Sequence, residues 1–196
     1  HMLILGSRYI GKPIMSLQTG GRLGIAKRAL IDPTNLTVAA YEVTGPLVTE
    51  HPTYLRVAEI REIAPIGMII DSNDDLIGLD DVIRIKQLHD IGFGLIDMHV
   101  IDESKRKLGK VSDYTLEISS FVIEQLHVRR GVIRGITETS LLIHRSQVVK
   151  VTDNEIIVKS TAKKVSAEPV KVARRHDYVN PFRQPTPQTE SASDAS

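Results

Sequence analysis

The feature that most constrains this chain is an internal repeat with a spacing of 85 residues. Residues 23–43, LGIAKRALIDPTNLTVAAYEV, align with residues 108–128, LGKVSDYTLEISSFVIEQLHV. Few residues are identical, but the apolar register is kept. The matching pairs are Leu23 with Leu108, Gly24 with Gly109, Ala26 with Val111, Ile31 with Leu116, Val38 with Ile123 and Val43 with Val128. A repeat of this kind predicts two copies of one structural unit.

Within each copy, the pattern of apolar residues is typical of β-strands. Short segments that are β-branched or alternate between apolar and polar residues are separated by turn sequences such as DPTN, SNDD and TDNE. The strands are expected at residues 37–43, 67–71, 95–102, 119–128, 140–151 and 154–159. Residues 74–88, DDLIGLDDVIRIKQL, also allow a turn or two of helix. We therefore predict an all-β fold.

The repeat also predicts how the chain divides. The first copy gives a domain at residues 8–90 and the second a domain at residues 91–160. Modules of roughly 70 to 80 residues lie near the lower limit for an independent hydrophobic core. Closing each sheet into a barrel would remove exposed strand edges, and packing the barrels together would bury more surface. We expect two small β-barrels in tandem.

The composition changes after about Ser160. Residues 161–196 hold six Lys or Arg against four Asp or Glu, and they end in QPTPQTESASDAS, which is rich in Pro, Ser, Thr and Gln. Such a sequence cannot bury enough apolar surface to offset the entropy lost on ordering. We predict a disordered or loosely docked tail at residues 161–196, with a net positive charge beside a nearly neutral body.

Residues 174–185, RRHDYVNPFRQP, are the candidate partner-binding segment of this tail. Tyr178 and Phe182 supply apolar anchors, and Arg174 and Arg175 supply positive charge. The Asn-Pro step favours an extended backbone that can lie in a groove or add to a sheet edge. Three interpretations stay open: the segment can dock on a partner protein, dock on the barrels of its own chain, or stay disordered.

The composition excludes several classes of protein. The chain has no cysteine, which rules out disulfides, thiolate nucleophiles and cysteine-ligated metals. No uncharged apolar run approaches the roughly 18 residues of a spanning helix, and the apolar start MLIL is too short for a signal sequence. We expect a soluble, cytoplasmic protein without membrane insertion. His1 and Met2 resemble the remnant of a cleaved tag.

Residues 6–13, GSRYIGKP, match all but the last position of the phosphate-binding signature G-x-x-x-x-G-K-[ST]. The last position is Pro13, which offers neither a hydroxyl for Mg²⁺ nor an N–H group for phosphate. The residues that follow lack a helical period and soon reach a Gly-Gly turn. We therefore expect no nucleotide cofactor.

Other candidate chemistry is also weak. Residues 71–82, DSNDDLIGLDDV, are acidic, but Leu76 and Val82 replace the glycine and glutamate that a calcium loop needs. The histidines show no metal-ligand spacing, and no nucleophile signature surrounds any serine. We expect no metal site, no cofactor and no enzymatic activity.

Residues 10–43, IGKPIMSLQTGGRLGIAKRALIDPTNLTVAAYEV, resemble the opening half of a PRC-barrel domain. In that family a Gly-x-Pro lead-in, a first strand, a turn and a Leu-Gly step precede a long strand that ends in Ile-Asp. The second copy closes with LLIHRSQVVKVTDNEIIV, which resembles the end of such a barrel, although it begins with GLIDMH and lacks the Gly-x-Pro lead-in. The resemblance implies that Gly11, Lys12 and Pro13 lead into a strand and that Gly6 is incidental.

The resemblance also suggests a function. PRC barrels occur in a photosynthetic reaction-centre subunit, in a ribosome maturation factor and in prokaryotic adaptor proteins, and the barrel itself is not enzymatic in these uses. The expected function is thus a non-enzymatic adaptor that binds a protein partner through barrel surfaces and tail, with self-association left open. The alternative is a ribosome-maturation-like factor that binds a ribosomal protein or rRNA. Basic residues 163–175 favour this alternative, whereas the neutral body and scarce aromatic residues disfavour it.

Overall fold

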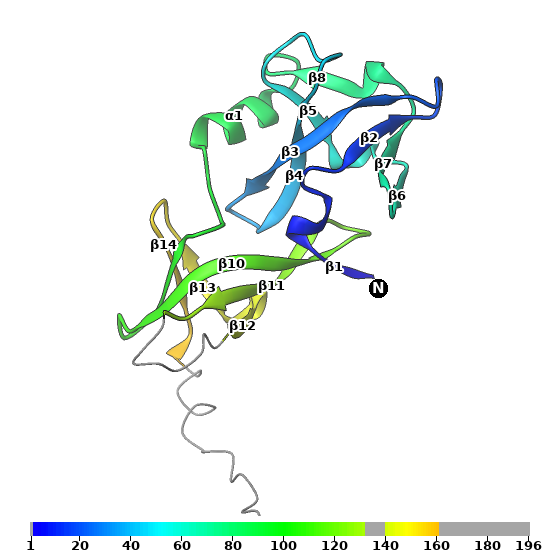
Figure 1. The fold of residues 1–196 in the computed structure, drawn as a ribbon. Coiled ribbons are helices and arrows are strands. Elements are labelled where there is room, and N and C mark those ends of the chain that lie inside the picture. Colours follow the sequence, from blue (N-terminus) through cyan, green and yellow to red (C-terminus); the bar gives the residue numbers. More distant parts are fainter. Residues whose placement is uncertain (1, 132–139, 161–196) are drawn as a thin grey trace, which may run out of the picture. The chain divides into compact units, whose positions relative to one another are not determined.

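The structure is a computed structural model that describes residues 2–131 and 140–160 (Figure 1). Residues 1–160 belong to one unit. The predictions for residues 161–196, including the partner-binding segment, lie outside the described residues. Most of the described elements are strands, which confirms the all-β class. The strands are β1 (Leu3–Leu5), β2 (Pro13–Ser16), β3 (Arg22–Asp32), β4 (Thr37–Thr44), β5 (Thr53–Arg56), β6 (Glu62–Ala64), β7 (Gly67–Ile70), β8 (Leu76–Gly78), β9 (His99–Asp102), β10 (Lys107–Glu117), β11 (Val122–Arg129), β12 (Ser140–His144), β13 (Val148–Val151) and β14 (Glu155–Val158).

The helical elements of the described residues are short. One α-helix, α1 (Ile83–Ile91), begins inside the segment whose spacing was ambiguous and ends at Gly92, which adopts the left-handed conformation that terminates helices. Four 3₁₀ turns complete the inventory, η1 (Gly6–Tyr9), η2 (Val57–Glu59), η3 (Asn73–Asp75) and η4 (Arg145–Gln147). In the part of the chain that the structure describes, no helix combines the length and the apolar character that crossing a bilayer requires.

The two repeats have the same strand order. In the first, the order is β6-β7-β2-β3-β4, with β5 beside β4 and β8 beside β5. In the second, it is β13-β14-β9-β10-β11, with β12 beside β11. One pair in each repeat is parallel, β2 with β7 and β9 with β14, while the other pairs are antiparallel. The same mixed sheet is therefore built twice.

The 85-residue register is confirmed at the level of single residues. The antiparallel pair β3–β4 has irregularities between Ala26 and Arg28 and between Leu30 and Ile31. The pair β10–β11 has its irregularities at the positions 85 residues later. Since a β-bulge changes which face a side chain occupies, equal bulges keep equivalent residues on equivalent faces.

The two repeats meet at their longest hairpins. Thr37 of β4 pairs with Val122 of β11, and these residues are themselves 85 apart. The backbone N–H groups of Val38 and Ile123 donate to the carbonyl oxygens of Phe121 and Leu36, each at 2.9 Å. An antiparallel contact between equivalent residues relates the two hairpins by a local two-fold axis.

Side chains reinforce this junction. The Arg145 guanidinium donates to the backbone oxygens of Asn35 at 2.8 Å and Ile123 at 3.0 Å, so it holds both hairpin turns at once. Each turn also has a buried carboxylate at its first corner. Asp32 accepts hydrogen bonds from the N–H and hydroxyl of Thr34, and Glu117 does so from residues 119 and 120. These carboxylates satisfy turn groups that a strand ladder leaves unpaired.

The strand pairings of the described residues do not form two closed barrels. They form one open fourteen-stranded sheet that runs from β13 through β11 and β4 to β6. The outer strands β6 and β8 have three residues each, and each pairs with a single neighbour. Short edges limit unwanted pairing with other chains, so the sheet tolerates them.

The main hydrophobic core extends through both repeats. It includes Ile14, Leu55 and Met68 of the first repeat together with Leu116 and Ile156 of the second, all nearly or fully inaccessible. A smaller cluster lies under α1 and contains Leu30, Ala40, Tyr54, Ile85 and Leu88. The division at residues 90 and 91 stays a prediction, because one apolar cluster contains residues from both sides of it.

The equivalent glycines Gly24 and Gly109 allow a direct test of the repeat. A Cβ at Gly24 would lie 2.7 Å from the carbonyl oxygen of Thr44, and one at Gly109 would meet the equivalent carbonyl of Arg129. Gly109 also has a φ of 142°. We expect Gly24→Val and Gly109→Val each to lower the free energy of unfolding by about 1 to 3 kcal/mol, with Gly109→Val nearer the upper end. Urea denaturation measures both losses, and a neutral effect at either position would contradict the shared geometry. Gly94→Ala, in open space, is the control.

Glu117 gives the junction a predictable response to acid. Hydrogen bonds from Ser119 and Ser120 lower the pKa of this carboxyl from 4.5 to about 2. Its charged form therefore stabilises the fold above about pH 4.5, and the contribution is lost as the pH falls towards 2. We expect Glu117→Gln to be less stable than the native chain at pH 7, with the gap narrowing between pH 4.5 and 2. Urea midpoints at several pH values test this; Glu62→Gln, at an exposed glutamate, is the control. A gap that does not change with pH would refute it.

Candidate functional site

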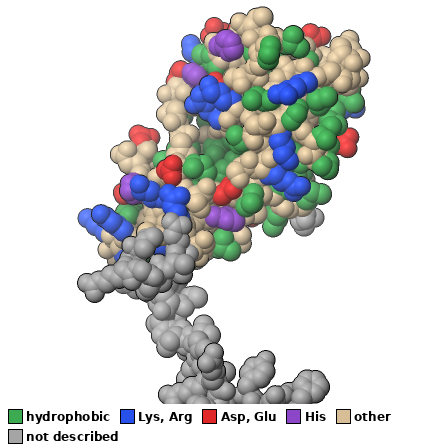
Figure 2. Space-filling view, viewed as in Figure 1, with side chains coloured by type: hydrophobic (Ala, Val, Ile, Leu, Met, Phe, Trp, Pro, Cys, Tyr) green, Lys and Arg blue, Asp and Glu red, His purple; other side chains and the backbone are tan. Residues whose placement is uncertain are grey.

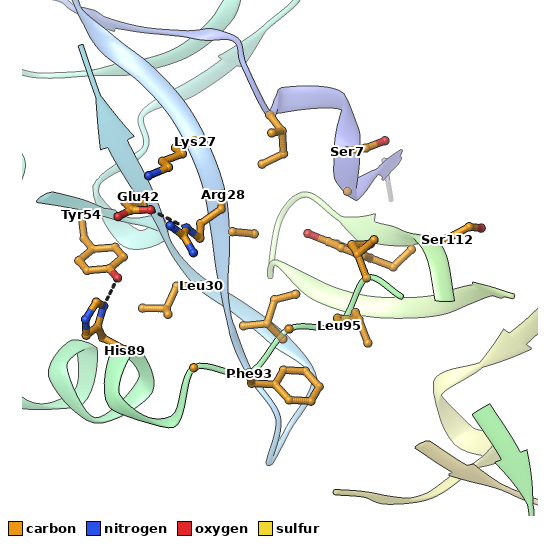
Figure 3. A pocket seen from close by; sticks show the side chains of 18 residues that line it. Ser7, Lys27, Arg28, Leu30, Glu42, Tyr54, His89, Phe93, Leu95 and Ser112 are labelled. Carbon is orange, nitrogen blue, oxygen red and sulfur yellow. Dashed lines mark hydrogen bonds and ion pairs between the residues drawn. The ribbon is translucent and has the colours of Figure 1, made fainter. Parts of the chain in front are cut away.

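A half-open cavity of about 640 Å³ lies where the two repeats face each other. In Figure 2, hydrophobic side chains lie inside this hollow and lysine and arginine side chains lie around it. Residues of β3, β4, β5 and α1 form one side, whereas η1, β10 and the linker after α1 form the other (Figure 3). The lining residues are Gly6, Ser7, Ile10, Lys27, Arg28, Ala29, Leu30, Ile31, Glu42, Tyr54, His89, Gly92, Phe93, Gly94, Leu95, Ile96, Ser112 and Tyr114. We call it the inter-repeat pocket.

Two equivalent lead-in segments form part of the pocket wall. Residues 6–10 precede β2, and residues 92–96, with a shift of 86, precede β9. Each segment is followed by a residue with positive φ, Gly11 at 82° and Asp97 at 68°. The backbone N–H of Gly11 donates over 2.7 Å to the carbonyl of Ala26, at the first bulge of β3. The N–H of Asp97 donates over 2.7 Å to the carbonyl of Val111, at the first bulge of β10. The second repeat therefore has the same lead-in as the first, although its sequence lacks the Gly-x-Pro motif.

At one end of the pocket, which we call its mouth, the lining side chains are apolar. Ile10 and Ile96, the last residues of the two lead-in segments, are 38% and 47% exposed. Behind them, Leu95 is buried and Phe93 is half-buried, and Figure 3 shows both side chains on the same side of the pocket. Exposed isoleucines beside a hollow extend its apolar surface outwards, which is typical of a site that buries an apolar group of a partner or ligand.

Tyr54 and His89 form a hydrogen-bonded pair at the opposite end. The Tyr54 hydroxyl lies 2.6 Å from Nδ1 of His89, and the rings meet edge to face. Burial, together with the negative charge of Glu42, raises the pKa of Tyr54 above its ordinary value of 10. The phenol is therefore protonated at neutral pH. In the tautomer in which the phenol donates to Nδ1, the imidazole carries its proton on Nε2, and His89 then presents a further donor to the pocket.

Two cationic side chains lie beside this pair on β3. The Arg28 guanidinium makes an ion pair with Glu42 through Nε and Oε2 at 2.6 Å, and the arginine side chain stays 63% exposed. Lys27 is exposed and makes no ion pair with any described residue. Lys27 and Arg28 are adjacent and both line the pocket because β3 has an irregularity between Ala26 and Arg28. The polar end of the pocket thus carries uncompensated positive charge.

The wall formed by η1 and β10 supplies hydroxyl groups instead of cations. Ser7 donates its hydroxyl to Asp113, and Ser112 donates to the His127 carbonyl at 3.2 Å. The Tyr114 ring lies directly against Gly6, where any Cβ would overlap it. The interpretation of Gly6 as incidental is therefore wrong, because this wall has no room for a side chain.

These side chains are suited to binding. No cluster of three metal-binding side chains occurs among residues 2–131 and 140–160. The Ser7 hydroxyl contacts Asp113, whereas His89 contacts Tyr54, and no bond joins the two pairs. What the pocket offers is an apolar surface with hydrogen-bond donors and positive charge at one end.

The motifs weighed in the sequence occupy other places. Pro13 begins β2, as the resemblance implied, and the Lys12 ammonium donates to the carbonyl of Pro65 at 3.2 Å while lying over the Tyr9 ring. In the acidic segment 71–82, carboxylates cap turns. Asp75 accepts from the backbone of residues 71 and 72, and Asp81 accepts from Gly78.

Sequence reasoning did not find the pocket. The proposed partner-binding residues Arg174, Arg175, Tyr178 and Phe182 lie outside the described residues. A signal was nevertheless present, because Gly6 and Ile10 recur 86 residues later as Gly92 and Ile96, just before each first strand. Glu42, Tyr54 and His89 come from β4, β5 and α1, and only the folded chain brings them beside Lys27 and Arg28.

The electrostatics of the polar end can be tested by titrating Tyr54. We expect its phenol, followed by NMR of ¹³C-labelled tyrosine and assigned with Tyr54→Phe, to ionise above pH 10. Glu42→Gln should move this midpoint down, because the carboxylate opposes a second negative charge nearby. An unshifted Tyr54 midpoint, or one that does not respond to Glu42→Gln, would contradict this account of the site.

A comparison with known proteins adds no assignment. Neither a scan against protein-family models nor a search of curated proteins found a match for the chain. The function has to be argued from the geometry of the inter-repeat pocket.

Proposed function

We propose that this protein is a non-enzymatic adaptor whose inter-repeat pocket holds an apolar segment of a partner protein. We further propose that each repeat is a module of the PRC-barrel type. The supporting observations are the sequence resemblance, the equal strand order of the repeats and the one parallel pair in each, β2 with β7 and β9 with β14. The observation that carries the adaptor function is the apolar mouth of the pocket.

The energetics favour a binding role for Ile10 and Ile96. Burying a branched aliphatic side chain stabilises a complex by about 1.5 to 3 kcal/mol. Both isoleucines are large, exposed and adjacent to a hollow that already holds Phe93 and Leu95. Because Ile10 is 38% and Ile96 47% exposed, an interface that covers them would gain roughly half of this energy at each. The site is concave and preformed, so little conformational entropy is lost.

The tail belongs to this proposal as a second contact. Tyr178 and Phe182 carry apolar anchors, and Arg174 and Arg175 add charge. Two linked contacts raise the apparent affinity because the second binding step becomes intramolecular. Pocket and tail can therefore contribute separately, and each can be removed by substitution in the full-length chain.

The test is affinity purification from the native host with full-length bait. We expect Ile10→Asp/Ile96→Asp to reduce capture of the partner at least about tenfold, since each 1.4 kcal/mol lost is a tenfold change. Leu17→Asp is the matched control, because Leu17 is 57% exposed and does not line the pocket. It should capture the partner normally. Thermal midpoints within a few degrees of the native chain verify folding.

Other outcomes would contradict the proposal. Full capture by the pocket variant, with loss in Tyr178→Ala/Phe182→Ala, would place the contact on the tail. Recovery of RNA in place of a protein, released by nuclease or high salt, would favour the ribosome-maturation alternative. Turnover of a small molecule that requires Tyr54 and His89 would show an enzyme.

A further inference from the structure

The inter-repeat pocket has a strongly uneven distribution of hydrogen-bond donors. The Lys27 ammonium, the outer N–H groups of Arg28 and Nε2 of His89 all belong to the side formed by β3 and α1. No described residue is within hydrogen-bond distance of the Lys27 ammonium or of His89 Nε2. A ligand that satisfies these groups must present acceptors at that end.

The charge of the lining residues points to an anionic acceptor. Glu42 is the one carboxylate in the lining, and its Oε2 atom is already paired with Arg28 at 2.6 Å. The charges of Arg28 and Glu42 cancel, so the Lys27 ammonium gives the pocket lining an excess of one positive charge. A carboxylate complements this end best, since hydrogen bonds between ionised partners are roughly twice as strong as neutral ones.

The rest of the pocket calls for an apolar group. The cavity of about 640 Å³ lies within the range of ligand pockets and continues at its mouth into Ile10 and Ile96. These residues line a hollow, whereas docking to a lipid surface would require an apolar patch that projects outwards. A peptide that enters the hollow with one side chain and continues across the mouth fits this shape.

We propose that the inter-repeat pocket binds an extended peptide segment in which an apolar side chain is followed within a few residues by a carboxylate. The apolar side chain fills the space between Ile10, Leu95 and Ile96, and the carboxylate faces Lys27, Arg28 and His89. An Asp or Glu side chain or a free C-terminus supplies the same carboxylate chemistry. This inference rests on the proposed adaptor function and specifies the partner's binding segment.

The test is a selection of random heptapeptides displayed on phage against the full-length protein, with internal and C-terminal display compared. We expect enrichment of sequences with an apolar residue near an acidic one, and loss of this enrichment against Ile10→Asp/Ile96→Asp. Synthetic copies of the enriched peptides then give Kd values by fluorescence polarisation. Lys27→Glu should weaken their binding about tenfold or more, in line with the loss of a charge-assisted hydrogen bond.

Matched variants make the result specific. Lys150→Glu changes an exposed lysine outside the pocket and should leave the Kd unchanged. A selection on Lys27→Glu should no longer favour acidic peptides, and native-chain binding should weaken as salt is raised.

The outcomes separate this inference from the adaptor function. Enriched peptides without acidic residues, or a Kd that Lys27→Glu does not change, would overturn the carboxylate preference while leaving the adaptor function intact. Binding of a free fatty acid with no peptide selected would replace the peptide by a small amphiphile. Enrichment that does not depend on Ile10 and Ile96 would overturn both proposals.

Discussion

An exchange of backbone hydrogen bonds between two hairpin turns sets how the two repeats are arranged. The N–H groups of Val38 and Ile123 each donate to the opposite turn over 2.9 Å. Leu36 and Phe121, which supply the accepting carbonyls, both have positive φ, at 49° and 56°. Such backbone conformations are uncommon for non-glycine residues and persist where the surroundings fix them. The contact joins both sheets at equivalent points, and a local two-fold arrangement follows from it.

This arrangement explains why the pocket lies between the two repeats. Its two walls have equivalent backbones but carry different side chains. Lys27 in β3 and Ser112 in β10 are equivalent by the 85-residue shift, and both line the pocket. The frameworks are alike, but one copy presents a cation where the other presents a hydroxyl. Duplication thus supplied two matching walls, and substitution at the equivalent positions made one wall cationic. An amphiphilic ligand has a defined orientation in such a site.

Much of the fold was predictable from local pattern. The bulges of β3 recur in β10, and every buried position of β11 is also buried in β4, because apolar periodicity and turn residues specify a strand and its inward face. Closure of the sheet was not predictable. Closure depends on whether short outer strands such as β6 and β8 pair with each other. The sequence of a strand does not specify which other strand lies beside it. The lead-in turn at Asp97 could not be recognised in the sequence either, because an aspartate there adopts a positive φ that is expected of glycine.

The β-class, the duplication and the residue-by-residue correspondence of the copies can all be read from the chain, since they follow from short-range spacing of apolar and turn residues. The site arises only when the elements pack together. Gly6 meets the ring of Tyr114, and Tyr54 meets His89, across separations of 108 and 35 residues in the chain. Contacts of this kind arise when whole hairpins and a helix pack together, and the free energy that selects the packing is spread over the shared core. A pocket made from both repeats therefore exists only once the two sheets have joined.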